Sequence, residues 1–258
     1  MSESAAKALD ILFYLARSGG DVTLARLSRE TGMNKATALR YLSALESRGV
    51  AERRNGGWSL GLALFELGNQ VPIRSIVVDR IRPILERLCR ESGESANLAC
   101  LAGSSAIYLD RVEADRSLRM RVAPGDRLPL YCTGVGKAIL SLLSEERVRS
   151  ILGTVPLPRI NEMTITDPDE ILRESLRARE MGYGIDREEY EIGLTCIAMP
   201  LRLPGSDFAG AISVSGPTAR MKDPVARDRF IRLLSNAAAE ATEALSSAAL
   251  VAKVIPQA

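Results

Sequence analysis

The feature that most limits the possible fold is a short stretch near the N-terminus. It contains two residues typical of helix N-caps, Thr23 and Asn34, and a glycine between them, Gly32. Thr23 is typical of a helix N-cap, and Gly32 suits the left-handed end of a short helix predicted over residues 24–30. Asn34 is a second N-cap, and the leucines that follow predict a second helix ending at Arg48. We therefore expect two helices joined by a tight turn.

Each of these two helices has one face that we expect to be buried. Leu24 and Leu27 share a face of the first helix, and the second carries a stripe formed by Leu39, Leu42 and Leu45. The opposite side of the second helix then faces solvent beside the positive end of its dipole, as in a recognition helix that enters a major groove. The residues expected to contact DNA there are Lys35, Ala36, Thr37 and Arg40.

A hairpin is predicted directly after the second helix. Gly49 ends that helix, and residues 51–54 and 58–60 can pair as strands across residues 55–57, because Asn-Gly suits a tight turn. Such a hairpin is the wing of a winged helix-turn-helix. The side chains expected to reach DNA phosphates from it are Arg53 and Arg54. A helix pair that only packs is the alternative, and the wing makes it the weaker one.

Composition narrows the function further. Residues 17–54 contain eight basic and four acidic residues, a charge of +4 in a chain whose net charge is +2. This excess predicts a nucleic-acid surface confined to the N-terminal part, with ordinary scatter of surface charge as the alternative. The chain has no histidine, which removes Ser-His and Cys-His nucleophile pairs and histidine-ligated metal sites.

The four cysteines lack the Cys-x-x-Cys spacing of zinc sites, and we expect them to be reduced thiols. No signal peptide is recognisable, and no apolar run approaches the roughly 18 residues of a membrane span. We therefore expect a cytoplasmic protein with no membrane association, no catalytic residues, no metal and no cofactor.

Helical patterns flank the helix-turn-helix. A helix beneath it is predicted from Leu9, Leu12, Phe13 and Ala16. A short helix over residues 62–67 and a longer one over residues 73–90 follow, and the longer one carries a stripe of Val77, Ile81, Ile84 and Leu88. Pro83 should bend or interrupt that helix. It is either a connector that contacts a second subunit or a plain core helix.

The remainder of the chain mixes strands and helices in an α+β pattern. Strands are predicted over residues 97–101, 106–111, 118–122, 195–203 and 208–215, with a turn at residues 204–207. Helices are predicted over residues 134–143, 145–152 and 169–181. A last helix starts at Asp223-Pro224 and has an apolar face formed by Val225, Phe230, Leu233, Leu234, Ala237 and Ala241. We expect an antiparallel sheet with helices around it.

Several ordered motifs resemble the IclR family of bacterial transcription regulators, over about residues 4–250. They are TGMNKATALR at 31–40, IRPIL at 81–85, ESGE at 91–94, LPLYCTGVGKA at 128–138, GYG at 182–184, DREE at 186–189, GLTC at 193–196 and ISVSGP at 212–217. The family often has proline and serine where this chain has Asn34 and Ala36. That departure leaves the operator preference open.

The resemblance implies four parts: a winged helix-turn-helix domain over residues 1–66, a linker helix region over 67–92, a GAF-like effector-binding domain over 93–250 and a tail over 251–258. It also implies a homodimer or homotetramer that binds a double-stranded DNA operator. A small-molecule effector, expected to be a small organic acid, would regulate that binding. None of these assembly properties follows from the spacing of residues.

The family's ligand contacts fall on positions that physical reasoning also favours. Gly134 belongs to a glycine-containing loop whose N–H groups could face an anion, with an ordinary tight turn as the alternative. Ser213 and Ser215 share one strand face and need hydrogen-bond partners if buried. The effector-binding residues implied are Leu128, Leu130, Gly134, Val135, Asp186, Cys196, Ser213 and Ser215. Lys137 is the cation in the motif that contains Gly134, and a carboxylate is expected to be held by backbone and hydroxyl donors.

Three other functions remain open at this point. The C-terminal domain could be an enzyme, which the missing histidine disfavours. The winged helix could bind protein instead of DNA, in which case binding would lack a steep salt dependence. The cysteines, Cys196 above all, could sense oxidants.

Overall fold

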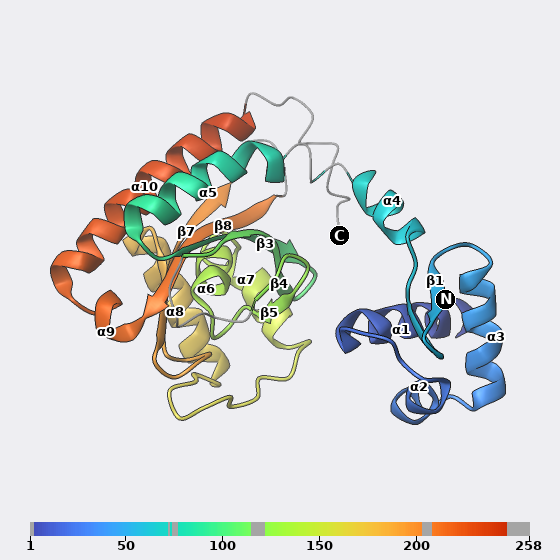
Figure 1. The fold of residues 1–258 in the computed structure, drawn as a ribbon. Helices are drawn as coiled ribbons and strands as arrows, with labels where there is room; N and C mark the ends of the chain where they lie inside the picture. The colour runs from blue at the N-terminus through green and yellow to red at the C-terminus, as the bar shows by residue number, and fades with distance from the viewer. Residues whose placement is uncertain (1–2, 72, 74–76, 115–121, 203–207, 247–258) are drawn as a thin grey trace. The chain divides into compact units, whose positions relative to one another are not determined.

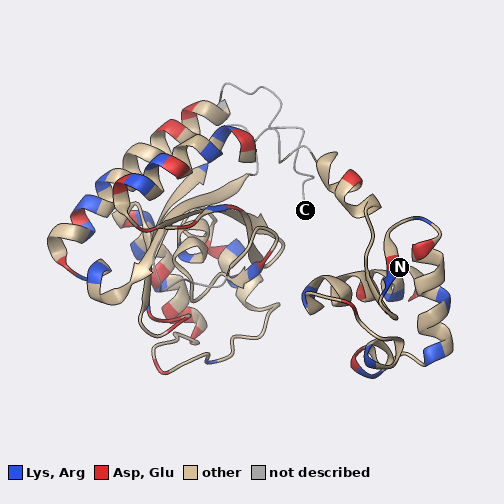
Figure 2. Ribbon diagram, viewed as in Figure 1, with Lys and Arg blue, Asp and Glu red and all other residues tan. Residues whose placement is uncertain are grey.

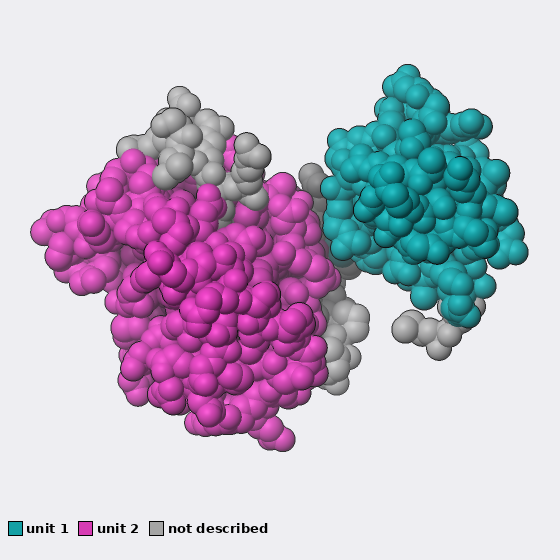
Figure 3. Space-filling model, turned by 90° about the horizontal axis from the view of Figure 1, so that it is seen from below, with its two compact units in different colours: residues 1–72 teal, residues 73–258 magenta. Residues whose placement is uncertain are grey.

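The computed structural model describes residues 3–71, 73, 77–114, 122–202 and 208–246. The chain divides into two compact units, residues 1–72 and residues 73–258 (Figure 3). Unit 1 contains the predicted helix-turn-helix, and unit 2 contains the predicted sheet.

Unit 1 has the predicted order of elements (Figure 1). They are α1 (Glu3–Ser18), α2 (Leu24–Thr31), α3 (Lys35–Glu46), β1 (Ala51–Arg54), β2 (Gly57–Leu60) and α4 (Ala63–Asn69). The Thr23 hydroxyl accepts a hydrogen bond from the Arg26 N–H, and the Asn34 side chain accepts one from the Thr37 N–H. Gly32 is left-handed at φ 69°. These contacts confirm the predicted caps, and α3 ends two residues before the predicted Arg48.

The wing is a tighter hairpin than predicted. Arg54 pairs directly with Gly57, so the turn contains two residues, Asn55 and Gly56, instead of three. Both have positive φ, 46° and 78°, which is the backbone of a type I′ turn. The wing is anchored because Val22 and Trp58 exchange two backbone hydrogen bonds of 2.8 Å.

The buried faces of α1 and α3 differ from the prediction. Leu9 and Phe13 are 52% and 61% exposed, and Ile11 and Leu15 are the buried residues of α1. In α3 the buried pair is Ala38 and Leu42, and Leu39 is exposed. Apolar residues are dense enough in both helices to form several stripes, and helical spacing alone cannot choose between stripes that lie on different sides. Contacts with the rest of unit 1 made the choice.

Unit 2 is built on a sheet whose order is β5-β4-β3-β8-β7-β6, with antiparallel neighbours throughout the described residues. Its strands are β3 (Ser95–Ala102), β4 (Ser105–Val112), β5 (Arg127–Pro129), β6 (Gly184–Arg187), β7 (Leu194–Arg202) and β8 (Ala209–Pro217). The α+β architecture is confirmed. The short strands β5 and β6 were missed, because three or four residues show too little alternation. The turn at 204–207 lies outside the described residues, as does all of the strand at 118–122 except Val122.

Helices cover both faces of this sheet (Figure 1). On one face α5 (Asp79–Ser92) and α10 (Pro224–Ser246) share an apolar core with the strands. On the other lies α6 (Gly134–Leu140), with α7 (Glu145–Leu152) and α8 (Pro168–Met181) packed into the same second core. A short helix, α9 (Thr218–Met221), precedes α10. Because α6, α7 and α8 cover it, the α6 face of the sheet is shielded from solvent.

Two expectations for these helices need correction. Pro83 does not interrupt α5, which continues through it and buries Ile81, Ile84, Leu85 and Leu88, as a core helix does. Helical backbone also precedes α5, where residues 77–78 form a π-helical turn ahead of the proline. Val225 is exposed, because it lies in the first turn of α10, ahead of the part that packs on α5.

Candidate DNA-binding surface and effector site

The N-terminal half of α3 presents the predicted contact residues. Lys35, Ala36 and Arg40 are exposed, and Thr37 is half-buried. Figure 2 shows basic residues at the start and in the middle of α3. Within the described part of the chain, neither Lys35 nor Arg40 forms an ion pair, and the Arg40 guanidinium lies 5.4 Å from the centre of the Tyr41 ring. Both charges are therefore free to meet a phosphate or a base edge.

The two wing arginines are not equivalent. Arg53 and Arg54 are both exposed, but the Nε of Arg54 lies 2.7 Å from a carboxylate oxygen of Glu52. Asn55 at the tip donates a hydrogen bond to Asp21, which fixes the turn to the base of the unit. Arg53 thus carries the wing's uncompensated charge.

Unit 2 gathers buried polar residues on the α6 face of its sheet. We call Asn97, Asp186, Cys196, Ser213 and Ser215 the polar cluster. Strand register brings them together, because Cys196 of β7 pairs with Asp186 of β6 and with Ser215 of β8, and Asn97 of β3 pairs with Ser213. The amide of Asn97 donates to the hydroxyls of Ser213 and Ser215, at 3.1 and 3.3 Å. Each member of the polar cluster is buried.

The start of α6 lies directly against the polar cluster. A side-chain carbon added to Gly134 would lie 2.7 Å from the carbonyl oxygen of Cys196, and one added to Gly136 would lie 2.2 Å from that of Leu130. The glycines are therefore required for this close approach. Thr133 caps the helix by accepting a hydrogen bond from the Gly136 N–H at 3.1 Å. The structure thus brings Gly134 and Val135 to the predicted strand residues.

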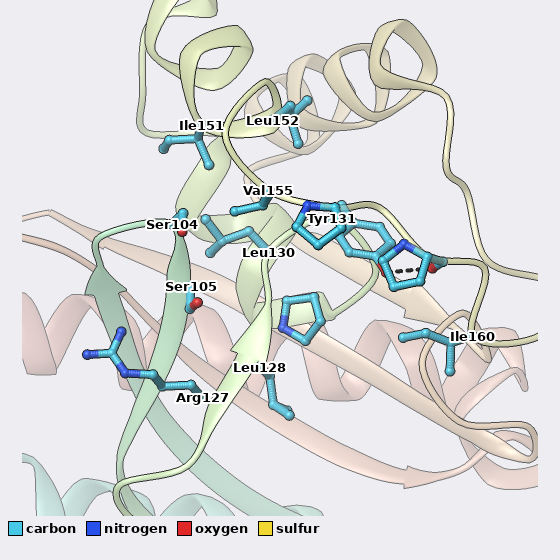
Figure 4. Close-up of a pocket in the computed structure, with 13 residues that line it drawn as sticks. Ser104, Ser105, Arg127, Leu128, Leu130, Tyr131, Ile151, Leu152, Val155 and Ile160 are labelled. Carbon is cyan, nitrogen blue, oxygen red and sulfur yellow. Dashed lines mark hydrogen bonds between the residues drawn. The ribbon is translucent and has the colours of Figure 1, made fainter. Parts of the chain in front are cut away.

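The two predicted leucines line a pocket away from the polar cluster. Leu128 and Leu130 border a pocket of about 300 Å³ beside β5, together with Ile151 and Leu152 of α7 (Figure 4). No member of the polar cluster lines this pocket. Arg127 and Tyr131 also border it, and the Tyr131 hydroxyl donates to the Pro158 carbonyl at 2.7 Å. The eight predicted effector residues therefore fall into two groups.

Burial governs the protonation of the polar cluster. It raises the pKa of Asp186 from its ordinary value to about 7, although a hydrogen bond from the Glu189 N–H opposes the rise. Burial also raises the pKa of Cys196 to about 12, so its thiol stays protonated at neutral pH. The buried Lys137 ammonium lies 2.5 Å from Glu189 and 3.4 Å from Glu174, so its charge is balanced.

Sequence reasoning missed two buried polar residues on this face, Asn97 and Arg111. Asn97 lies in a predicted strand and Arg111 at the end of the next one. The sequence does show that Arg111 is a charged residue within a predicted strand. It does not show that Arg111 pairs with Asn97, because that pairing depends on the register between the two strands.

The fold defines a class of protein: a winged helix-turn-helix domain followed by an α+β domain with a buried polar cluster. Residues 4–55 match the IclR helix-turn-helix domain, and residues 69–243 match the family described as bacterial transcriptional regulator IclR C-terminal. The chain belongs to the IclR family of bacterial transcription regulators.

Individual relatives agree with this assignment. The HTH-type transcriptional regulator BhcR of Paracoccus denitrificans is 37% identical, over 93% of this chain and 85% of its own length. The HTH-type transcriptional repressor AllR of Escherichia coli K12 is 32% identical, over 90% of this chain and 86% of its own. The crystal structure of a putative IclR regulator from Silicibacter sp. has a TM-score of 0.81 at 27% identity, covering 94% of this chain and 96% of that one. The protein is thus a helix-turn-helix transcription regulator.

Proposed function

We propose that this regulator binds a small organic acid at the polar cluster and that this acid controls its affinity for an operator. The observation that carries the proposal is the polar cluster itself. Five polar side chains lie buried against the start of α6, beside the apolar core that α6, α7 and α8 form with the sheet. Burying polar groups costs free energy unless they are hydrogen-bonded. In this cluster the side-chain oxygen of Asn97 has no partner among the described residues, and a bound ligand can supply one.

The geometry favours a small hydroxy, keto or aromatic acid. The hydroxyls of Ser213 and Ser215 and the thiol of Cys196 are donors of a hydrogen bond. Asp186 in its protonated form, which its raised pKa of about 7 favours below neutral pH, donates one as well. Such donors suit the oxygen atoms of a keto acid or hydroxy acid. We expect no turnover, because the Cys196 thiol stays protonated and the chain has no histidine to activate it.

On the DNA side, Lys35, Ala36, Thr37 and Arg40 would contact bases in the major groove. Arg53 and Arg54 would contact phosphates. The effector regulates binding only if it favours one arrangement of the DNA-binding units over another. We infer a homodimer or homotetramer in the cytoplasm, where a DNA operator is found. Among the described residues, no helix is long and apolar enough to cross a bilayer.

The decisive experiment measures binding of the full chain to the DNA upstream of its own gene at several salt concentrations. Affinity should fall steeply with salt, because binding releases counterions from the phosphates. Thermal-shift assays with glycolate, pyruvate and benzoate then test the effector class. Salt-insensitive binding would favour a protein-binding winged helix, and a panel in which no acid raises the melting temperature would remove the small-acid proposal.

A further inference from the structure

Arg111 lies beside the polar cluster through an irregularity in strand pairing. Between β3 and β4 the register shifts at Leu98/Ala99, so Leu109 is the extra residue of β4. Beyond the shift, Arg111 pairs directly with Asn97. Residues directly opposite each other on antiparallel strands extend to the same side of the sheet. The β-bulge therefore places Arg111 on the α6 face, next to the amide that bridges Ser213 and Ser215.

The guanidinium of Arg111 is buried with its donors unused. Its side chain is 3% exposed. None of its three nitrogens has a hydrogen-bond partner among the described residues. Glu113 forms an ion pair at 3.4 Å from Nε, but that carboxylate is about half exposed. An arginine cannot lose its proton, and its planar donors match a carboxylate in two parallel hydrogen bonds. A buried guanidinium that keeps its charge and has unused donors would be stabilised by binding an anion.

Among the described residues, the other buried cation, Lys137, is already balanced. Lys137 contacts Glu189 and Glu174. The positive charge of Arg111 also reaches the cluster, since it partly opposes the burial that raises the pKa of Tyr108 and of Cys196. The side-chain oxygen of Asn97 is likewise buried without a partner in the described part of the chain. Unused donors and an unused acceptor thus lie side by side.

We propose that Arg111 binds the carboxylate of the effector and thereby selects acids over uncharged compounds of the same shape. The inference rests on the proposed function and deepens it. It assigns the negative charge of the ligand to Arg111, and the ligand's hydroxyl or keto oxygen to the serines and Asp186. It also replaces the expectation that backbone and hydroxyl donors alone hold the carboxylate.

The test compares each acid with its neutral amide: glycolate with glycolamide, pyruvate with pyruvamide, benzoate with benzamide. Calorimetric titration of the unaltered full chain should show tighter binding of an acid than of its amide. In Arg111→Gln that preference should disappear, with the acid losing roughly tenfold to a hundredfold in affinity, as expected for a lost charged hydrogen bond. Arg111→Lys keeps the charge without the planar fork and should give an intermediate loss.

Arg127→Gln is the matched control. Arg127 lies on the neighbouring strand β5, is exposed and borders the apolar pocket of Figure 4. Its substitution should leave acid binding unchanged. Loss of binding in Arg127→Gln but not in Arg111→Gln would place the acid in the apolar pocket and overturn the inference. Folding is followed by melting temperature without ligand, which should hold in Arg111→Gln because a poorly paired buried charge is removed.

The outcomes separate this inference from the proposed function. If an acid binds the unaltered chain and Arg111→Gln with the same preference over its amide, the role of Arg111 is refuted and the effector proposal stands. If no acid of the panel binds the unaltered chain, both fail. If Arg111→Gln does not fold, Arg111→Lys decides, because unchanged acid affinity and preference in that variant would refute bidentate binding.

Discussion

The two units use arginine in opposite ways. Arg40 of α3 is exposed, has no carboxylate partner among the described residues and lies in water, where salt screens its charge. Arg111 of β4 is buried, and its charge acts in a medium that screens poorly. An exposed arginine such as Arg40 suits contact with DNA, a long polyanion that stays hydrated. A buried arginine such as Arg111 suits a single small anion that loses its hydration when it binds. Burial, more than residue type, therefore decides which partner a cation fits.

The largest effect should come from the packing that holds the buried site. An alanine side chain at Gly136 would lie 2.2 Å from the Leu130 carbonyl oxygen, so backbone must shift. We expect Gly136→Ala to lower the stability of unit 2 by about 3 kcal/mol, the upper part of the range for overpacked cores. Alanine normally stabilises a helix relative to glycine, so the sign itself is informative.

Denaturant titration of the full chain measures this change. Gly153→Ala is the control in the same unit, because its nearest neighbour would be at an ordinary 3.4 Å. Operator binding at a temperature where both units are folded should be retained in Gly136→Ala. Equal stability of the two alanine variants would show that the start of α6 has room to relax.

The next effect concerns the exposed surface. Arg40→Ala should weaken operator binding by roughly tenfold to a hundredfold, the range for a lost base contact. The melting temperature of the protein should stay unchanged, since Arg40 is exposed. Fluorescence anisotropy with labelled operator DNA measures the affinity. Arg17→Ala removes an exposed charge from α1 and should have little effect; an equal loss in both variants would mean that only total charge matters.

A pH effect is expected at the buried site. Burial raises the pKa of Asp186 from 3.8 to about 7, so the folded chain holds this proton more tightly than the unfolded chain does. This carboxyl's contribution to stability is therefore greatest at low pH, declines between about pH 4 and pH 7, and is lost above that. Asp186→Asn should show a smaller decline over this window. Above pH 7 the ionised Asp186 should also weaken binding of an acid to the unaltered chain.

Thermal unfolding at pH 5, 6, 7 and 8 measures the effect, with Asp228→Asn as the exposed control. Identical pH profiles for Asp186→Asn and the unaltered chain would mean that Asp186 is hydrated and ionised in the folded state.

The smallest effect should come from the wing. Arg53→Gln should weaken DNA binding severalfold and reduce the slope of log affinity against log salt by about one, as for one lost phosphate contact. Arg54→Gln should do less, because Glu52 already neutralises part of its charge. Salt titrations of both variants check this order. The reverse order would show that the Glu52 ion pair breaks when DNA binds.

Sequence alone determined the elements whose signals are local. Thr23, Asn34 and Gly32 act within three or four residues of their own positions, and the Asn55-Gly56 turn follows from the positive φ that these two residue types favour. The family motifs also predicted candidate site residues at the start of α6 and on β6, β7 and β8. These motif residues can be recognised from residue type and order along the chain, without knowledge of how the strands pair.

Only the tertiary structure decided what depends on register and on packing. The burial of Ile11 in place of Leu9 follows from which stripe of α1 meets the rest of unit 1. The meeting of Asn97 with Ser213, and of Arg111 with Asn97, follows from strand pairing and from one register shift. A slip of one residue would turn every side chain of a strand to the other face. That geometry is a property of several distant segments at once, so no single segment of the sequence reveals it.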